Sequence, residues 1–295
     1  PIRDSKEVQR DMLDIEVYNN NQIPAWCPGC GNFSILRCMK QALSELDISP
    51  DRLLMVSGIG QAAKAPHYFR CNLFNGLHGR DISVGAGAKI ANHELLVISE
   101  SGDGNTYGEG GNHFIHNIRR NINMKVFIHN NQIYGLTKGQ ASPTSDTGMK
   151  TKVQVDGVIN PPFNPIAVAI ALNASFVARS FSGDPEHLVS MMKSAITHKG
   201  FAILDILQPC VTFNRLNTFQ WYRQRVYKLD DSYDPTDRKL AFEKALEWGD
   251  KIPIGVIYKN NRPVYEEQLQ QLKDGPLYKQ PVTGIDYSDV LKEFI

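Results

Sequence analysis

Short apolar runs alternate with segments of helical periodicity along most of the chain. The runs are typical of strands buried on both faces of a sheet, and they lie in RLLMVSGIG (52–60), ELLVISESGDG (94–104), MKVFIHNNQIYG (124–135), SFVARSF (175–181) and FAILDIL (201–207). Apolar side chains recur at helical spacing in the segments 31–46, 81–92, 111–121, 164–174 and 184–200. Strands that alternate with helices predict an α/β fold with a doubly wound, mostly parallel sheet.

The composition changes after the last of these strands and becomes richer in aromatic and charged residues. One further helix (237–248) and one further strand (252–259) are expected there. Residues 1–212 are therefore interpreted as one α/β domain, and residues 213–295 as a C-terminal extension that packs on this core or on a partner subunit. Residues 140–163 are rich in Ser, Thr, Pro and Gly and have no periodicity, which indicates a long functional loop.

Charge and hydropathy exclude several classes of protein. The 295 residues carry a net charge of +1 with scattered basic side chains, so no nucleic-acid partner is expected. No apolar run is long enough to span a bilayer, and the polar start PIRDSKEVQRDML does not resemble a signal peptide. We therefore expect a cytoplasmic protein without a membrane partner.

Polar residues follow two of the predicted strands at the point where each strand ends. Asp103 stands between Gly102 and Gly104, and Asn131 ends the next strand. In such sheets ligands bind beyond the carboxyl ends of the strands, and Mg²⁺ prefers carboxylate, amide and main-chain oxygen ligands. Asp103, Asn131 and the carbonyl of Ile133 could bind Mg²⁺, while the two glycines would let a phosphate approach the backbone.

Simpler interpretations of the same residues remain open. Asp103 could cap the following helix, and Asn130 with Asn131 could form a turn. A dinucleotide-binding loop is excluded because Tyr107 occupies the third glycine position of that motif.

The five cysteines suggest a metal or redox site near the N-terminus. Cys27 and Cys30 lie in WCPGCG, and an odd number of cysteines argues against a secreted disulfide framework. Thiolates suit both iron–sulfur clusters and zinc, and spacing alone does not separate the two. A thioredoxin-like dithiol is less favoured because no strand precedes Cys27.

Taken in order, the motifs WCPGCG, SGIG, LHGR, GDG followed by NN, YGLTKGQASPT and LQPC resemble the β subunit of 2-oxoacid:ferredoxin oxidoreductases over residues 24–258. The resemblance implies the thiamine diphosphate-binding fold, with thiamine diphosphate, Mg²⁺ and one 4Fe–4S cluster. It also implies CoA-acylating decarboxylation of a 2-oxoacid, or the reverse CO₂ fixation, with ferredoxin as electron partner. An α subunit would carry the pyrimidine-binding domain, in an (αβ)₂ assembly. The Gln-Ala-Ala loop variant favours the 2-oxoglutarate branch, and pyruvate or broad specificity remains open.

The resemblance assigns Cys27, Cys30 and Cys210 to the cluster. The family's remaining cysteine usually follows SGIG, where this chain has Gln61. Cys71 is the expected substitute, and a cluster with three thiolates or with a non-cysteine ligand is the alternative. Cys38 is expected to be a core residue.

The resemblance also implies contacts with the cofactor and the substrate. Lys64 and His78 are the candidate catalytic residues, although without the resemblance they would be a solvated lysine and a turn histidine. The expected cofactor-binding residues are Ile59, Gly60, Gln61, Ala62, His78, Gly102, Gly104, Asn105, Gly135, Leu136 and Thr137.

Two rival hypotheses explain fewer of these features. A non-redox thiamine diphosphate enzyme with a structural zinc would share GDG and NN, but would leave the set of three cysteines unexplained. A non-catalytic metal-binding scaffold would not bind thiamine diphosphate at all.

Overall fold

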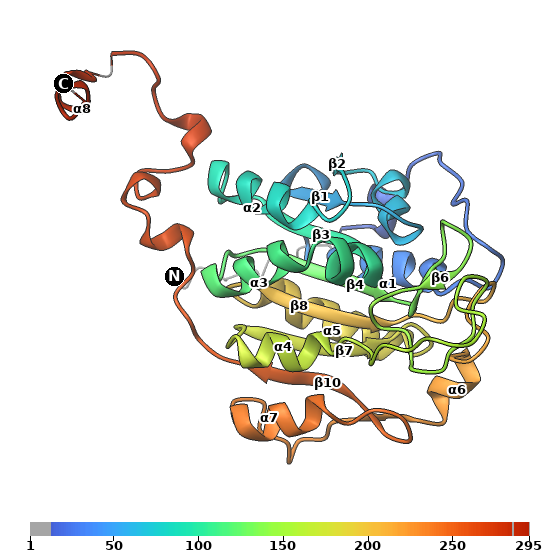
Figure 1. Cartoon of the computed structure of the whole chain (residues 1–295). Coiled ribbons are helices and arrows are strands. Elements are labelled where there is room, and N and C mark those ends of the chain that lie inside the picture. The colour runs from blue at the N-terminus through green and yellow to red at the C-terminus, as the bar shows by residue number, and fades with distance from the viewer. Residues whose placement is uncertain (1–12, 285, 295) are drawn as a thin grey trace, which may run out of the picture.

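The computed structural model describes residues 13–284 and 286–294, and its centre is a mostly parallel sheet (Figure 1). Eight strands of the described residues join it in the order β2-β1-β3-β4-β8-β7-β10-β9. The antiparallel pairing among them is that of β10 with β7, so β10 and its parallel neighbour β9 run opposite to the other six. The strands are β1 (Leu53–Ser57), β2 (Asn72–Asn75), β3 (Leu96–Gly102), β4 (Lys125–Asn130), β7 (Phe176–Phe181), β8 (Ala202–Leu207), β9 (Val226–Lys228) and β10 (Ile252–Lys259). The predicted α/β fold with a mostly parallel sheet is confirmed.

Helices cover both faces of the sheet (Figure 1). On one face, α1 (Gly31–Glu45) and α5 (Pro185–Thr197) pack against the strands, and on the other lie α2 (Asp81–Ala91), α3 (Gly111–Arg120), α4 (Pro165–Ala171) and α7 (Arg238–Ala245). Each face buries its own apolar core, which is the arrangement that fully buried parallel strands require.

Shorter elements complete the described chain. They are the small hairpin of β5 (Ile133–Tyr134) and β6 (Gln140–Ala141), the helices α6 (Phe219–Arg223) and α8 (Ser288–Lys292), the π-helical segment η4 (Gly104–Glu109), and the 3₁₀ segments η1 (Ile15–Tyr18), η2 (Pro50–Arg52), η3 (Ala62–Tyr68), η5 (Glu266–Gln268), η6 (Gln270–Leu272) and η7 (Leu277–Lys279). None of the described helices is long and apolar enough to cross a bilayer.

Two features of the sheet differ from the sequence expectation. The edge strand β2 was not predicted, because all four of its residues are exposed and pairing with β1 alone defines it. The strands β9 and β10 of the C-terminal segment join the main sheet through the pairing of β10 with β7. After β10 the chain runs along the outside of the molecule, and α8 lies apart from the sheet (Figure 1).

The register of the central strands brings several loops to one edge of the sheet. Gly102 at the end of β3 pairs with His129 near the end of β4, and Asn130 pairs with Leu207 at the end of β8. The loops that follow these strands therefore leave the sheet side by side, at the carboxyl edge where ligands bind in open α/β sheets.

A buried lysine makes hydrogen bonds at the amino ends of the central strands. The Nζ of Lys125, the first residue of β4, donates hydrogen bonds to Oδ1 of Asn123 and to the carbonyls of His198 and Gly200. Burial lowers the pKa of Lys125 to about 7. The lysine thus joins β4 to the turn between α5 and β8.

We expect Lys125→Met to lower the free energy of unfolding by about 2 kcal/mol or more, because buried carbonyls lose their donor. Chemical denaturation of the purified chain measures this. Lys199→Met is the matched control, since the ion pair of Lys199 with Glu267 is more than half exposed and should contribute less than about 1 kcal/mol. Equal losses in the two variants would contradict the role given to Lys125.

Candidate active site

A single buried carboxylate lies at the centre of the carboxyl edge. Asp103 follows β3 directly and is 1% exposed. Its Oδ2 accepts hydrogen bonds from the hydroxyls of Ser142 at 2.5 Å and Thr144 at 2.6 Å, and the main-chain N–H groups of Gly104 and Asn131 also face it. Burial raises the pKa of Asp103, and these donors oppose the rise. The donors therefore fix the direction of the carboxylate.

The other two predicted magnesium ligands lie next to this carboxylate. Asn131 is the residue whose main-chain N–H faces Asp103, and its Oδ1 accepts a hydrogen bond from the N–H of Ile133 at 3.0 Å. Gln132 between them has a φ of +56°, so the chain turns back tightly at this point. One carboxylate, one amide and one main-chain carbonyl thus gather within a few residues of two strand ends, which is the type of oxygen set that suits Mg²⁺.

The turn expected at Asn130 and Asn131 is present, but Asp103 does not cap the following helix. It precedes η4 without making a side-chain capping hydrogen bond. Its carboxylate is instead turned toward Ser142 and Thr144, in the loop that the sequence analysis interpreted as functional.

A buried polar network that the sequence analysis missed continues from Thr144. Oγ1 of Thr144 also lies 2.9 Å from Oδ1 of Asn130, and Nδ2 of Asn130 donates to Oδ2 of Asp205 on β8 at 3.3 Å. Asp205 faces Nε of Arg179 on β7 at 3.8 Å. Burial raises the pKa of Asp205 to about 6, and the charge of Arg179 opposes the rise. The signal was a charged residue inside an apolar run, in SFVARSF and in FAILDIL.

Asn105, a predicted cofactor-binding residue, joins two loops of the site. Its Oδ1 accepts hydrogen bonds from the N–H groups of Ile59 at 3.0 Å and Gly79 at 2.8 Å, and its Nδ2 donates to Asp81 at 2.7 Å. The side chain thereby sets the distance between the loop after β1 and the turn that carries His78. Asn105 therefore positions these two loops relative to each other.

The turn at His78 depends on the glycine that follows. Gly79 has a φ of +64°, and a Cβ there would lie 2.4 Å from the carbonyl carbon of Glu109, so no other residue fits. His78 itself is exposed, and Lys64 in η3 is half-buried and forms no ion pair with an acidic side chain of the described residues. Their catalytic roles remain predictions.

The two glycines of the GDG motif differ in their surroundings, and their contact with a phosphate stays a prediction. A Cβ at Gly104 would lie 2.3 Å from Cε1 of Tyr134, so this glycine makes room for the tyrosine ring. A Cβ at Gly102 would meet only ordinary contacts, at 3.8 Å or more. The close approach at Gly104 is thus explained by packing within the chain.

The remaining predicted cofactor residues lie in two loops of the same edge. Gly60 in the loop after β1 has a φ of +100°, and this loop runs directly into η3. The segment from Gly135 to Thr137 forms the tip of the β5–β6 hairpin, where Thr137 donates a hydrogen bond to Gln140 at 2.6 Å. Contact of these segments with a cofactor remains a prediction.

Three of the cysteines gather beside this hairpin. Cys30 is the N-cap residue of α1. Burial raises the pKa of its thiol to about 11, and the neighbouring thiols of Cys210 and Cys27 raise it further. Nε2 of Gln208 lies 3.3 Å from Sγ of Cys30 and donates to it. A Cβ at Gly135 would stand 4.0 Å from Sγ of Cys210, so the thiols adjoin the predicted cofactor loop.

The structure does not bring Cys71, the expected fourth ligand, to these three thiols. Asn72 pairs with Leu54, so Cys71 stands level with Leu53 at the amino end of β1. Burial raises the pKa of its thiol to about 12, and the charge that it faces is that of Glu100. Because β2 runs parallel to β1, the residue before β2 must start at the amino edge. The sequence did not predict β2, so the position of Cys71 could not be anticipated.

No fourth thiol lies beside these three in the described chain, and no compact set of metal-binding side chains is found there. Cys38 is buried within α1, as expected, and its thiol contacts the carbonyl of Pro185 at 3.7 Å. Within residues 13–284 and 286–294, no three His, Cys, Asp or Glu side chains are arranged to hold a single metal ion. Cys27, Cys30 and Cys210 thus lie near one another, but their thiols are not arranged around one metal ion.

A buried chain of polar side chains joins the cysteine segment to the strands that precede the predicted magnesium ligands. Oδ1 of Asn32, in the first turn of α1, lies 2.8 Å from Nδ1 of His129 on β4. Nε2 of the same histidine lies 3.0 Å from Oε1 of Glu100 on β3. All three residues are almost fully buried. The start of α1 is thus fixed to the strands that end at Asp103 and Asn131.

Comparison with known proteins identifies the family. The model of the thiamine pyrophosphate enzyme C-terminal TPP-binding domain matches residues 56–206, and the model of the C-terminal part of the pyruvate ferredoxin oxidoreductase β subunit matches residues 210–274. The β subunit of the 2-oxoacid:ferredoxin oxidoreductase of a Sulfolobus species is 47% identical over 259 residues, which cover 83% of this chain and 85% of that protein. The chain belongs to the β subunits of the 2-oxoacid:ferredoxin oxidoreductases.

Two further relatives agree with this membership of the β-subunit family. The 2-oxoglutarate synthase subunit KorB of Methanocaldococcus jannaschii is 34% identical over 255 residues, which cover 84% of this chain and 92% of that protein. The solved structure of a 2-oxoglutarate:ferredoxin oxidoreductase from Magnetococcus marinus, with 2-oxoglutarate, coenzyme A and succinyl-CoA bound, superposes with a TM-score of 0.89. It is 33% identical, and the match covers 95% of this chain and 96% of that one. The resemblance stated from the motifs is confirmed.

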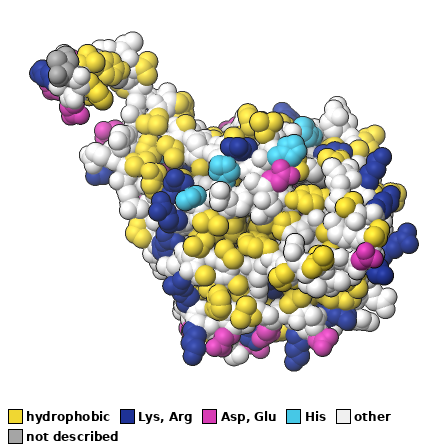
Figure 2. Space-filling model, in the orientation of Figure 1, with side chains coloured by type: hydrophobic (Ala, Val, Ile, Leu, Met, Phe, Trp, Pro, Cys, Tyr) yellow, Lys and Arg dark blue, Asp and Glu magenta, His cyan; other side chains and the backbone are white. Residues whose placement is uncertain are grey.

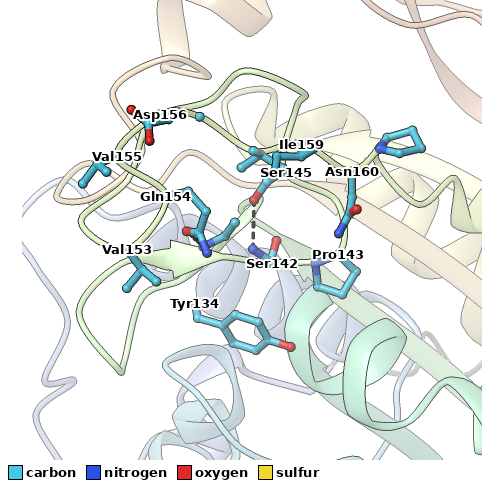
Figure 3. A pocket seen from close by; sticks show the side chains of 14 residues that line it. Tyr134, Ser142, Pro143, Ser145, Val153, Gln154, Val155, Asp156, Ile159 and Asn160 are labelled. Atoms are coloured by element: carbon cyan, nitrogen blue, oxygen red, sulfur yellow. Dashed lines mark hydrogen bonds between the residues drawn. The ribbon is translucent and has the colours of Figure 1, made fainter.

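The long loop of the β subunit walls a pocket (Figure 3). The pocket has a volume of about 610 Å³, and Tyr134, Ser142 and Pro143 line its inner side. Exposed apolar residues of the loop, including Val153 and Ile159, form its rim. Ser142 borders the pocket and also binds Asp103, but Asp103 itself is not part of the lining. The loop therefore separates the pocket from the predicted magnesium ligands.

We expect Gly31→Ala to destabilise the β subunit by about 1–3 kcal/mol, as overpacking does in other proteins. A Cβ at this first position of α1 would lie 2.7 Å from Cγ of Gln208 and 2.8 Å from Oγ of Ser182. Gly87→Ala is the matched control, because it lies exposed in α2 with open space around it and should stabilise the helix by about 0.5–1 kcal/mol. Urea denaturation measures both. A gain in stability at position 31 would contradict the packing described here.

Proposed function

We propose that this β subunit works with an α subunit in the CoA-acylating oxidative decarboxylation of 2-oxoglutarate, or in the reverse carboxylation, and that electrons pass through a 4Fe–4S cluster to ferredoxin. One observation carries the proposal. The oxygen set of Asp103, Asn131 and Ile133 and the thiols of Cys27, Cys30 and Cys210 lie at the same edge of the sheet, with the β5–β6 hairpin in contact with both.

The described residues suit thiamine diphosphate and Mg²⁺ in this arrangement. Asp103, Asn131 and the carbonyl of Ile133 would hold the metal ion, and the hydroxyls of Ser142 and Thr144 keep the carboxylate directed toward it. Bound thiamine diphosphate supplies the electron sink that decarboxylation of a 2-oxoacid requires. The loop after β1 and the hairpin tip would flank the cofactor, with Lys64 and His78 as candidates for contacts to the substrate carboxylate and the cofactor.

The three thiols suit an iron–sulfur cluster beside that cofactor. Thiolates are the ligands that iron–sulfur clusters prefer, and the N–H···S contact from Gln208 to Cys30 is of the kind that tunes their reduction potential. A structural zinc would serve the same ligands but has no redox chemistry. Because the reaction must release electrons singly to ferredoxin, iron is the better occupant.

The choice of 2-oxoglutarate rests on the relatives. The subunit from Methanocaldococcus jannaschii is named a 2-oxoglutarate synthase subunit, and the structure from Magnetococcus marinus contains 2-oxoglutarate, coenzyme A and succinyl-CoA. The Sulfolobus relative is named for 2-oxoacids in general, and the matched C-terminal model is named for pyruvate. Pyruvate or broad specificity is therefore the second candidate.

An α subunit partner is supported by apolar side chains that this chain leaves exposed. Leu73 and Phe74 on the edge strand β2 are nearly half exposed, and Leu77, next to His78, is 76% exposed. Exposed hydrophobic side chains also lie on the projecting C-terminal segment (Figure 2), among them Val282 and Phe294. We infer that the α subunit supplies the pyrimidine-binding domain and covers part of this surface in an (αβ)₂ complex.

We expect Asp103→Ala to remove thiamine diphosphate from the purified complex while its iron and sulfide content stays unchanged, because the metal loses its only carboxylate ligand. Thiamine diphosphate, iron and acid-labile sulfide are assayed in each preparation. Asp231→Ala is the control, because Asp231 is exposed in the segment between β9 and α7. This variant should retain thiamine diphosphate, iron and sulfide. Retention of the cofactor at normal stoichiometry in the Asp103 variant would refute the assignment of this site.

The substrate is tested with the co-purified α and β subunits and a panel of 2-oxoacids. We expect kcat/KM for 2-oxoglutarate to exceed that for pyruvate by about 10³-fold or more, because a site built to pair a second carboxylate rejects an analogue that lacks it. Reduction of ferredoxin follows the reaction. Equal values for the two acids would favour broad specificity, and no turnover of any 2-oxoacid would refute the proposed reaction.

A further inference from the structure

The cluster site has three thiols near one another, and the described chain brings no fourth thiol to them. Cys71 stands at the amino end of β1, and Cys38 is buried within α1 against Pro185. A cubane cluster has four irons, each of which needs a ligand outside the cluster. One iron must therefore be completed by something other than a cysteine of the described chain.

Gln61 is held beside the cysteine segment. Its main-chain carbonyl accepts a hydrogen bond from Nε1 of Trp26 at 2.8 Å, and Trp26 directly precedes Cys27. The indole ring is fixed in turn by edge contacts with Tyr68, at a centroid distance of 4.9 Å, and with Phe33, at 5.3 Å. The position of Gln61 relative to Cys27 is thus set by a buried aromatic side chain.

The side chain of Gln61 contains a buried acceptor that the described chain does not satisfy. Its Oε1 is buried and has no hydrogen-bond partner among the described residues. An unpaired buried acceptor destabilises the fold, and a cation within reach of the oxygen would relieve this. The amide oxygen therefore has the chemistry of a ligand for a metal that the chain itself does not contain.

We propose that Cys27, Cys30 and Cys210 are the only thiolates of this chain on the cluster, and that Oε1 of Gln61 faces its fourth iron. The inference rests on the proposed iron–sulfur function. An amide oxygen is neutral and harder than a thiolate, so it binds this iron more weakly. The cluster carries one negative charge less than a four-thiolate cluster, which raises its reduction potential. The fourth iron is consequently exchangeable.

Controlled oxidation removes such an iron. Ferricyanide accepts one electron from the oxidised 4Fe–4S cluster as one Fe²⁺ ion dissociates, and a 3Fe–4S cluster with all of its sulfide remains. Ferrous iron together with dithionite, which returns the electron, restores the original cluster. The two forms differ in their EPR spectra, so the exchange is followed without measuring enzyme activity.

The experiment compares the wild-type αβ complex, purified without oxygen, with Gln61→Cys and Cys71→Ser complexes. After one equivalent of ferricyanide, we expect the wild type and the Cys71 variant to lose a quarter of their iron, keep their sulfide and show the EPR signal of a three-iron cluster. We expect Gln61→Cys to keep its iron and to have a lower reduction potential. Gln61→Glu is the second variant at this position, and its carboxylate should slow the loss of iron.

The outcomes separate this inference from the proposed function. A wild-type cluster that keeps all its iron, together with loss of the cluster in Cys71→Ser, would overturn the inference and make Cys71 the fourth ligand. Iron loss at the wild-type rate in both Gln61 variants would also overturn it. Absence of iron and sulfide from the wild-type complex would instead refute the proposed cluster, and Cys27→Ser, which should lose the visible iron–sulfur absorbance, tests that point separately.

Discussion

The register between β3 and β4 is the constraint on which the site depends. Since Gly102 pairs with His129, Asp103 is level with Asn130, and Asn131, one residue further along, leaves the sheet close to Asp103. A slip by one residue would turn every side chain of β3 to the opposite face. It would move Asp103 away from Asn131. It would also turn Glu100 away from His129 and Asn32, to the face of the sheet opposite α1. The apolar faces of the strands therefore specify the geometry of the polar site at their ends.

The polar residues at this edge are buried, and hydrogen bonds and an ion pair join many of them to one another. Asp103 is oriented by Ser142 and Thr144, and Thr144 connects it through Asn130 to the pair of Asp205 and Arg179. Buried charges are tolerated only when they are paired or hydrogen-bonded. The long loop thus belongs to the site as firmly as the strands do, because its hydroxyls are the partners that keep a carboxylate in place beneath it.

Much of the architecture could be predicted from the sequence, because its signals are local. The apolar runs and helical periods indicated the five central strands and their helices, and Asp103 and Asn131 were found because each follows a strand. The position of Cys71 could not be predicted in this way, since it depends on the pairing of β2 with β1 and β2 has no buried face. Ser142 and Thr144 were missed because neither follows a predicted strand and their loop has no periodicity. Only the folded loop brings them to Asp103.

Buried side chains join the three thiols to the strands that precede the predicted magnesium ligands. Asn32, His129 and Glu100 fix the start of α1 to β4 and β3, while Gln208 fixes Cys30 to the end of β8. The thiols and the oxygen set therefore adjoin the carboxyl ends of strands of one sheet, and contacts within this chain hold both in place. An α subunit that completes the proposed thiamine site would not need to position the proposed cluster, because the candidate cluster ligands all belong to the β subunit.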